Sequence, residues 1–291
     1  MSLARRVVAK ATSFTPRQRR WQRLLASLTL DPDRLSQPVA PPGPRDFIIC
    51  GLPRSGTSLV TAALYQPPRV VTVMEPWDGM RLAPAELFSS LRAEIGSGRL
   101  TRGRLDVASL LAHGRVEWCR DGDRPIAIDV APDYLLGVKW PAFWRYLDLL
   151  PDTRFVVCVR HPAEVVASFR STQGRLARGL EYDLAFNRGM NEQLLAATDD
   201  PMTRQILLVE AITRGVAPHL DRPNVFTVRY ERWFDDRDAL LESLSAFLGV
   251  DVTAPPVVVG PRPPREDAVV LTELVRRHSA APALLGYDLA G

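Results

Sequence analysis

The sequence predicts an α/β protein in which helices flank both faces of a parallel β-sheet. Short apolar runs alternate with longer stretches of helical periodicity, which is typical of βαβ units. Several of the apolar runs are continuous, as in strands that are buried on both sides. With 291 residues and 46% hydrophobic content, the chain is large enough to bury a sizeable core in a single domain.

The expected strands and helices follow one another along the chain. The expected strands are 46–50 (DFIIC), 69–74 (RVVTVM), a third region bracketed by 124–132 (RPIAIDVAP) and 135–140 (LLGVKW), 153–160 (TRFVVCVR) and 224–230 (NVFTVRY). The expected helices are 58–66, 140–151, 162–170, about 183–198, about 203–217, 235–249 and one last helix after 265. Pro162 stands in the first turn of its helix, where a missing N–H costs nothing.

Composition divides the chain into three parts. Residues 1–45 form a basic N-terminal arm and a proline-rich linker, 46–249 form the α/β core with a helical insertion at about 80–120, and 250–291 form a proline-rich tail with a C-terminal helix. The arm is expected to be helical. It packs on its own domain, frays, or makes weak contact with a membrane surface.

Charge and cysteine content narrow the functional classes. The net charge of +4 and a pI near 9.2 are mildly basic, which suits a solvated surface with a basic cleft for a small polyanion and predicts no nucleic-acid partner. Cys50, Cys119 and Cys158 are odd in number and show no C-x-x-C spacing, so we expect free thiols. No apolar run is long enough to span a bilayer, and the N-terminus lacks the apolar region of a secretory signal. These features predict a cytoplasmic protein.

Residues 51–58, GLPRSGTS, follow the first strand and have the outline of a phosphate-binding loop. The nucleoside-triphosphate form of this loop is G-x-x-x-x-G-K-[ST]. Gly51, Gly56 and Ser58 fit that pattern, but Thr57 stands in the place of the lysine. Backbone N–H groups at such a strand–loop–helix junction converge on an anion without any side chain. The fold class is therefore a P-loop-type parallel sheet, and a plain structural turn is the alternative.

The strand 153–160 ends in Arg160, where magnesium-dependent phosphoryl transfer would need an acid. An arginine at that point repels a metal ion and attracts a second phosphate group. The sequence therefore predicts a nucleotide with an additional phosphate and a reaction without a metal.

At this point the sequence resembles the sulfotransferases that use 3′-phosphoadenosine-5′-phosphosulfate (PAPS). GLPRSGTS resembles their 5′-phosphosulfate loop, and FVVCVRHPAEVVASF (155–169) resembles their 3′-phosphate motif. GVKWPAFWRYLDLLPDTRF (137–155) resembles the segment before it in the bacterial, carbohydrate and tyrosyl-protein branches, and VRYERWFDD (228–236) resembles the tyrosine-glutamate signature. The four segments occur in family order and cover most of residues 46–240.

The resemblance assigns donor-binding residues by position. The backbone of Pro53, Arg54, Ser55, Gly56, Thr57 and Ser58 would cradle the phosphosulfate of PAPS. Arg160 and Ser168 would hold the 3′-phosphate, and Tyr230 would contact the adenosine. Eight positions separate Arg160 from Ser168, so a guanidinium at the strand end and a hydroxyl on the next helix can bracket one phosphate. An ordinary helix-surface serine is the alternative for Ser168. The product would be adenosine 3′,5′-bisphosphate.

The resemblance also assigns the catalytic groups. Glu75 follows the strand 69–74 directly, at the edge where ligands bind in such sheets, and matches the family's glutamate base. Lys139 and Arg54 would neutralise the leaving phosphate oxygen. Asp129, with Asp133 just beyond it, is the rival base. His113 and His161 are histidines of suitable chemistry, but neither falls where the family places its base. Five aromatic residues are candidates to wall the acceptor pocket: Trp77, Trp140, Phe143, Trp144 and Tyr146. The last four recur at helical spacing, so the core is the alternative for most of them.

The sequence departs from the family at three points. His161 stands where many relatives have aspartate, Trp140 follows the lysine, and the glycine-and-lysine C-terminal motif of the phenol and steroid enzymes is missing. The expected acceptor is therefore a hydroxyl of a sugar, a glycolipid or another small metabolite. A phosphotransferase using ATP and magnesium, and a non-catalytic nucleotide-binding protein on the same scaffold, are the competing functions.

Overall fold

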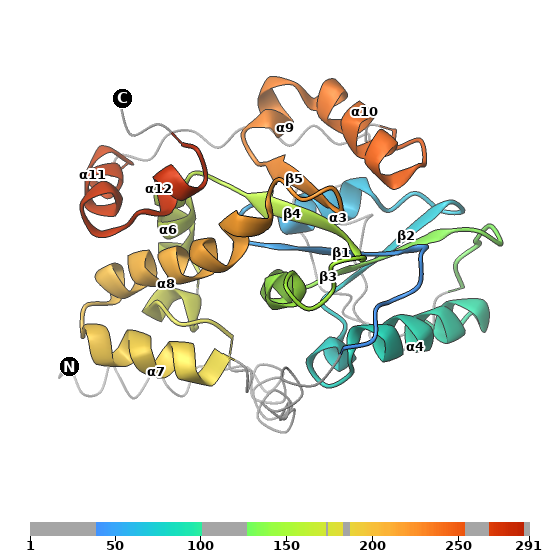
Figure 1. Cartoon of the computed structure of the whole chain (residues 1–291), viewed down its shortest axis with the longest axis horizontal. Helices are drawn as coiled ribbons and strands as arrows, with labels where there is room; N and C mark the ends of the chain where they lie inside the picture. Colours follow the sequence, from blue (N-terminus) through green and yellow to red (C-terminus); the bar gives the residue numbers. More distant parts are fainter. Residues whose placement is uncertain (1–38, 101–126, 173, 183–186, 254–267, 288–291) are drawn as a thin grey trace, which may run out of the picture.

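The computed structural model describes residues 39–100, 127–172, 174–182, 187–253 and 268–287, and a five-stranded parallel sheet lies at its centre (Figure 1). The strands are β1 (Asp46–Gly51), β2 (Val70–Met74), β3 (Leu135–Lys139), β4 (Arg154–Val159) and β5 (Val225–Arg229). Their order is β2-β3-β1-β4-β5, so the chain leaves β1 in one direction and returns on its other side. In such sheets ligands bind beyond the carboxyl end of the strand where the order reverses.

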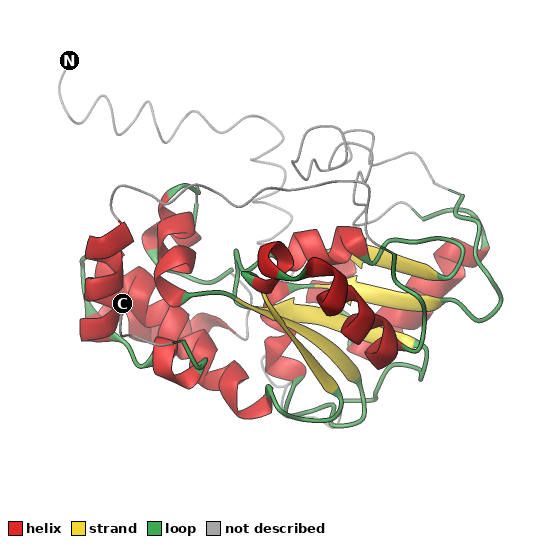
Figure 2. Ribbon diagram, turned by 90° about the horizontal axis from the view of Figure 1, so that it is seen from above, coloured by secondary structure: helices red, strands yellow, loops and turns green. Residues whose placement is uncertain are grey.

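Helices cover the sheet and extend beyond it. Their bounds are α3 (Thr57–Ala63), η2 (Trp77–Met80), α4 (Pro84–Gly96), η3 (Pro141–Tyr146), α6 (Pro162–Arg170), η4 (Leu176–Arg178), α7 (Arg188–Ala197), α8 (Pro201–Val216), η6 (Ala217–His219), α9 (Arg232–Asp235), α10 (Arg237–Leu248), α11 (Ala268–His278) and α12 (Ala281–Leu284), where η marks a 3₁₀-helix. Figures 1 and 2 show α6, α7, α8, α11 and α12 gathered at one end of the molecule, beside the sheet.

The side chains of β1 show why both faces of the sheet carry helices. Phe47 and Ile49 are fully buried in a cluster with residues of α3 and α10. Ile48 and Cys50 are fully buried in a second cluster with residues of α4, α6 and α8. Successive strand residues point to opposite faces, so a continuous apolar strand needs a cover on each side. The predicted α/β class with a parallel sheet is confirmed.

The predicted helix at 140–151 is wrong in type and length, because only the 3₁₀-helix η3 forms there. Trp140, Phe143 and Tyr146 recur every third residue, and a 3₁₀-helix with three residues per turn places such a set on one face. Their rings contact in sequence, with centroids 6.2 Å apart for the first pair and 5.2 Å for the second. All three are buried in the core, as is Trp144. Of the two interpretations, an acceptor-pocket wall or the core, their burial fits the core.

The third strand forms from only one of its two predicted segments. Leu135–Lys139 is β3, whereas 127–130 is not a strand. The other predicted strands and the helix at 162–170 are confirmed, and α4 supplies helical structure in the first part of the insertion. Cys50 and Cys158 are buried free thiols as predicted. The arm (1–38), the rest of the insertion with Cys119 (101–126) and most of the proline-rich tail (254–267) lie outside the described residues.

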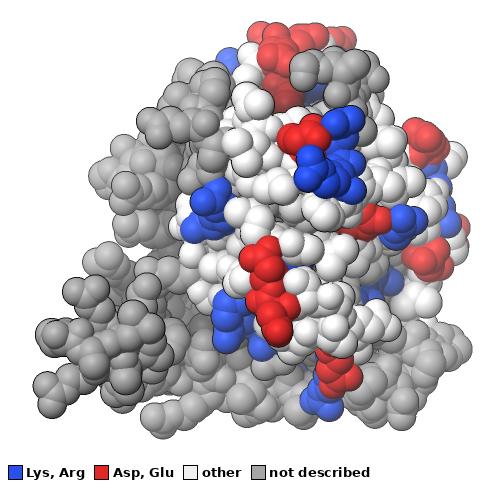
Figure 3. Space-filling model, turned by 90° about the vertical axis from the view of Figure 1, so that its left-hand side faces the viewer, with Lys and Arg blue, Asp and Glu red and all other residues white. Residues whose placement is uncertain are grey.

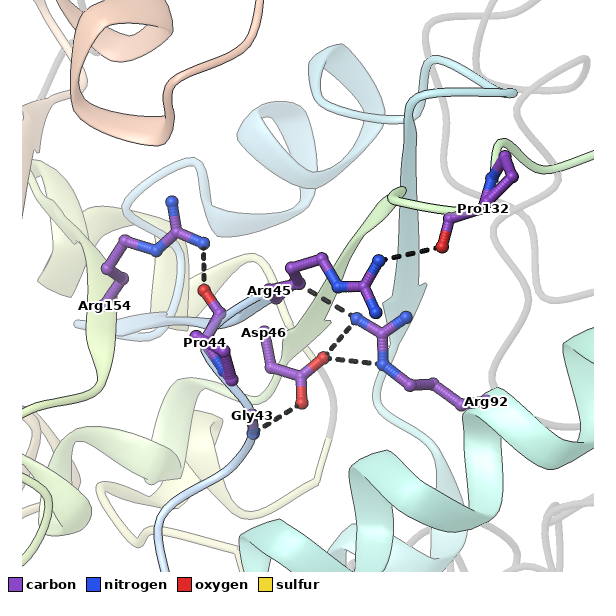
Figure 4. Close-up of polar contacts among 7 residues, drawn as sticks. All are labelled: Gly43, Pro44, Arg45, Asp46, Arg92, Pro132 and Arg154. Atoms are coloured by element: carbon purple, nitrogen blue, oxygen red, sulfur yellow. Dashed lines mark hydrogen bonds and ion pairs between the residues drawn. The ribbon is translucent and has the colours of Figure 1, made fainter.

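A polar cluster fixes the opposite, amino edge of the sheet (Figure 4). The carboxylate of Asp46 accepts hydrogen bonds from Arg92 of α4, at 3.0 Å to Nε, and from the Gly43 N–H, at 2.8 Å. Arg45 donates to the Pro132 carbonyl at 2.8 Å, and Arg154 donates to the Pro44 carbonyl at 2.7 Å. These contacts tie the segments before β1 and β3 together, away from the phosphate loop.

The surface of the helical end carries charges of both signs. Figure 3 shows lysine and arginine side chains interspersed with aspartate and glutamate on this face. Ion pairs such as Arg214 with Glu210 in α8 and Arg276 with Glu273 in α11 belong to the same group of helices. Among the helices that the structure describes, none is long and apolar enough to cross a bilayer.

Candidate active site

The carboxyl ends of all five strands deliver predicted site residues to one edge of the sheet. The loop 51–58 follows β1, Glu75 follows β2, Lys139 ends β3, Arg160 follows β4 and Tyr230 follows β5. The register aligns Met74 with Lys139 and Val159 with Arg229, which brings these ends level. Groups that lie as much as 179 positions apart in the sequence therefore lie at one edge of the sheet.

The loop needs glycine at two points. Gly51 has φ 123°, and a Cβ there would lie 2.2 Å from the Cys158 carbonyl oxygen. Gly56 has φ 90°, and a Cβ there would lie 2.5 Å from Cδ2 of Tyr230. Arg54 also takes a positive φ of 71°, although it has a side chain. At Gly51 the backbone packs directly on β4, and at Gly56 it packs on the Tyr230 ring. Glycine is needed at these two positions because a Cβ would overlap with these neighbours.

The side chain of Ser55 ties the loop to the sheet. Ser55 is fully buried, and its hydroxyl contacts the carbonyls of Leu52, at 2.5 Å, and Cys158, at 2.8 Å. The Leu52 N–H donates to the same Cys158 carbonyl at 3.1 Å. Pro53 is buried as well. What these residues offer a ligand is therefore the loop backbone, and their side chains hold its shape.

Arg54 connects the loop to α6. Its Nε donates a hydrogen bond to the Ser168 hydroxyl at 3.1 Å, across 114 positions of sequence. Ser168 is 4% exposed, so it is not an ordinary helix-surface serine. Arg54 therefore links the loop, which is predicted to bind the 5′-phosphosulfate, to Ser168, which is predicted to bind the 3′-phosphate together with Arg160.

Glu75 and Lys139 form an ion pair between neighbouring strand ends. Lys139 Nζ also lies 3.4 Å from the Ser58 hydroxyl, at the start of α3. The Glu75 N–H donates to the Lys139 carbonyl at 2.7 Å, and Glu75 has φ 46°, a left-handed conformation that is costly for a residue with a side chain. Lys139 therefore brings a lysine ammonium group to a loop that has Thr57 in the place of its own lysine.

Arg160 is buried against Tyr230 with one donor unused. Its guanidinium carbon lies 4.4 Å from the centre of the Tyr230 ring, and its terminal nitrogen donates to Glu164 at 2.9 Å. Arg160 is 8% exposed, and its Nε has no hydrogen-bond partner among the described residues. A buried donor without an acceptor is costly, so the Arg160 Nε–H is available to an oxygen atom of a ligand.

Tyr182 is a neighbour of this site that the sequence pattern did not single out. Its ring meets Trp140 edge-on, with centroids 6.2 Å apart, and Trp140 donates to the carbonyl of Pro76, directly after Glu75. Burial raises the pKa of the Tyr182 phenol, the Glu75 and Glu181 carboxylates raise it further, and Arg54 lowers it. Tyr182 thus lies within electrostatic reach of Glu75 and Arg54. No motif marks it, because it follows α6 in a segment without a signature.

The rival base Asp129 lies at the wrong edge of the sheet. Two residues after it, the Ala131 N–H donates to the Pro68 carbonyl, before β2 begins, and Pro132 accepts from Arg45 in the cluster of Figure 4. Asp129 and Asp133 are both exposed there. His113 lies outside the described residues. Of the two carboxylates Glu75 and Asp129, Glu75 is the one that lies at the edge of the sheet with the phosphate loop.

A comparison with known families matches residues 46–254 to the model of the Sulfotransferase family. A curated relative, the nodulation protein NoeE of Sinorhizobium fredii (strain NBRC 101917 / NGR234), is 27% identical over 225 residues. That match covers 72% of this chain, and the chain spans about half (51%) of the length of that relative.

Solved sulfotransferases were also found among similar structures. The sulfotransferase from Alicyclobacillus acidocaldarius is 18% identical, with a TM-score of 0.44 over 86% of this chain and 98% of that one. The mouse sulfotransferase SULT7A1, complexed with PAP, is 14% identical, with a TM-score of 0.35 over 92% of this chain and 72% of that one. The family match spans most of the chain and contains the loop, the strand ends and the residues around Tyr230. This chain therefore belongs to the sulfotransferase family.

Proposed function

We propose that this protein transfers the sulfuryl group of PAPS to a hydroxyl group of a small-molecule acceptor. Membership of the sulfotransferase family supports the transfer. The observation that carries the choice of donor is Arg160, a buried guanidinium with an unpaired Nε at the same edge as the phosphate loop. A nucleotide with phosphates at both its 5′ and 3′ positions would use the loop and Arg160 together.

The donor would lie between the loop and the ends of β4 and β5. The loop backbone from Pro53 to Ser58 binds the 5′-phosphosulfate, and the Arg54–Ser168 pair lies between the two phosphate positions. Arg160 binds the 3′-phosphate, and Tyr230, which holds the guanidinium from its other side, lies beside the adenosine. A charge-assisted contact from a desolvated arginine is among the stronger polar interactions available to a protein.

The reaction is an in-line displacement at sulfur. Glu75 takes the proton of the acceptor hydroxyl, and the acceptor oxygen forms a bond to sulfur. The bond between sulfur and the bridging oxygen breaks, and its electron pair stays on the 5′-phosphate of adenosine 3′,5′-bisphosphate. Lys139 and Arg54 offset the negative charge that grows on this oxygen. The Glu75–Lys139 ion pair at the ends of adjacent strands supports this assignment of the base and the cation.

An ATP-dependent phosphotransferase is the competing enzyme class. It would need a metal-binding acid at the end of a strand beside β1, and the two neighbours of β1, β3 and β4, carry Lys139 and Arg160 at their ends instead. Metal independence remains a prediction. Sulfuryl transfer in excess EDTA should match the untreated rate, and a loss that magnesium restores would favour the competing class.

A calorimetric titration tests the donor assignment. Adenosine 3′,5′-bisphosphate should bind more tightly than AMP or ATP, with and without magnesium, because only it engages Arg160. Arg160→Ala should weaken that binding by about 2 to 5 kcal/mol if the contact is desolvated, and should leave AMP binding nearly unchanged. Equal affinity of the unmutated protein for AMP and the bisphosphate would contradict the assignment.

A further inference from the structure

The C-terminal segment reaches the donor-binding edge through Tyr287. Its hydroxyl donates a hydrogen bond to Glu231 Oε2 at 2.8 Å. The other oxygen of the same carboxylate, Oε1, accepts the N–H of His161 at 2.9 Å. Glu231 directly follows Tyr230 and His161 directly follows Arg160. The Glu231 carboxylate therefore connects the residue after Arg160, which would bind the 3′-phosphate, to the residue after Tyr230, which would contact the adenosine.

The ring of Tyr287 adds two contacts to this bridge. It meets the His161 ring edge-on, with centroids 5.2 Å apart, and the guanidinium of Arg229 lies 5.1 Å from its centre. Burial, with the Glu231 carboxylate adding to the effect, raises the pKa of the Tyr287 phenol, so the hydroxyl keeps its proton and donates. The contacts come from β4, β5 and the C-terminal segment, at the edge of the candidate active site.

The C-terminal helices do not depend on this hydrogen bond for their docking. Leu271 and Val275 of α11 and Ala281 and Leu285 at α12 are buried in the main core. The Ala280 N–H also donates to Glu210 of α8 at 2.8 Å. The Tyr287 hydroxyl instead contacts the Glu231 carboxylate, which in turn accepts the His161 N–H at the start of α6.

We propose that Glu231 and Tyr287 are positioning residues for recognition of the donor's 3′-phosphate. The inference rests on the proposed use of PAPS. Glu231 holds the β4–α6 and β5–α9 junctions at a fixed separation, and these junctions carry Arg160 and Tyr230. Arg160 packs on Tyr230, so a shift of one junction displaces the guanidinium relative to the loop. The C-terminal segment therefore contributes to donor selection without touching the donor.

The test measures the affinities for adenosine 3′,5′-bisphosphate and AMP in Tyr287→Phe, which removes the hydroxyl and keeps the ring. The bisphosphate should bind about 3- to 10-fold more weakly, because a hydrogen bond to a charged group has been lost, and AMP should change by less than about twofold. Glu231→Ala should reduce the ratio of the two affinities more, and Glu231→Gln, which keeps an acceptor for the His161 N–H, should recover part of it. Saturating donor should restore kcat in Tyr287→Phe.

The matched control is Tyr134→Phe, which removes a tyrosine hydroxyl at the amino edge of the sheet, and it should leave both affinities unchanged. Thermal unfolding of each variant separates a loss of stability from a loss of selectivity. A lower Tm with an unchanged affinity ratio in both Tyr287→Phe and Glu231→Ala would overturn the inference while the proposed function stands. A wild-type protein that does not distinguish the bisphosphate from AMP would instead contradict the proposed function.

Discussion

Glu75 and Lys139 contact each other across the ends of β2 and β3, yet the proposed mechanism gives them opposite tasks. Glu75 acts on the acceptor before the oxygen attacks. Lys139, which also lies 3.4 Å from the Ser58 hydroxyl, acts on the donor as the bridging oxygen becomes negative. Because the two residues touch, a loss of activity in either variant alone does not assign a role, and acceptor chemistry must separate them.

Glu75→Gln keeps the size of the side chain and removes the base, so kcat should fall roughly 10²- to 10⁴-fold with little change in donor affinity. Lys139→Ala should also lower kcat, because its charge matters most in the transition state. Acceptors whose hydroxyl ionises readily should partly rescue Glu75→Gln but not Lys139→Ala. The measurement is kcat for both variants across acceptors of graded hydroxyl pKa, with donor binding followed separately.

Glu192→Gln is the matched control, since Glu192 is an exposed carboxylate of α7, and it should keep normal turnover. Near-normal kcat in Glu75→Gln would remove Glu75 as the base.

At the scale of residues, the sequence predicted which charged residues follow the strands, but it did not predict the hydrogen bonds between distant side chains. Arg160 and Glu75 were predicted because they come directly after apolar runs, where the chain must reach the edge of the sheet. The Arg54–Ser168 bond joins residues 114 positions apart, and no local pattern encodes it. Tyr182 and the Glu231–Tyr287 bond were missed for the same reason.

At the scale of elements, the phosphate loop depends on the close approach of its backbone to Tyr230. Gly56→Ala would place a Cβ 2.5 Å from the Tyr230 ring at a φ of 90°. The ring must then move, and Arg160, which packs on it, must follow. We expect the free energy of unfolding to fall by about 1 to 3 kcal/mol and the affinity for adenosine 3′,5′-bisphosphate to fall as well.

Gly189→Ala in α7 is the control for the glycine substitution, because a Cβ there meets nothing within 4 Å. It should raise the free energy of unfolding by up to about 1 kcal/mol, since alanine favours a helix. Chemical denaturation and donor titration of both variants provide the comparison. If Gly56→Ala binds the bisphosphate as tightly as the wild type, the loop does not need this contact with Tyr230.

Element types were predictable where the apolar period was clear. The strands read as continuous apolar runs, and Pro162 marked the start of α6. The prediction of an α-helix at 140–151 was wrong, because aromatic residues at 140, 143 and 146 fit both an α-helical and a 3₁₀ pattern. Only packing in the core selected the 3₁₀-helix.

At the scale of the whole molecule, one buried carboxyl should make stability depend on pH. Glu181 is fully buried, and burial raises its pKa from 4.5 to about 7, against the opposing Tyr182 N–H, Arg145 and Arg175. The folded protein thus holds this proton more tightly than the unfolded chain does. The stability from this group is fully present below pH 4.5 and is lost as the pH rises through about 7.

Glu181→Gln cannot ionise, so its free energy of unfolding relative to the wild type should increase between about pH 5 and about pH 8, by about 1 to 3 kcal/mol. Urea unfolding of both proteins at the two pH values measures this difference. The exposed Glu192→Gln should show no such change. A difference between wild type and Glu181→Gln that stays constant with pH would mean that Glu181 does not titrate in this range.

The sequence by itself determined the class of the fold, the loop and the strand-end charges, because these depend on short-range pattern: apolar period, glycine spacing and the residue after each strand. Only the tertiary structure decided the strand order β2-β3-β1-β4-β5, which puts Lys139 beside both the loop and Glu75. It also placed Asp129 at the amino edge and Tyr287 against Glu231. These outcomes depend on which distant segments pack together, and packing is set by the fit of the whole core rather than by any one segment.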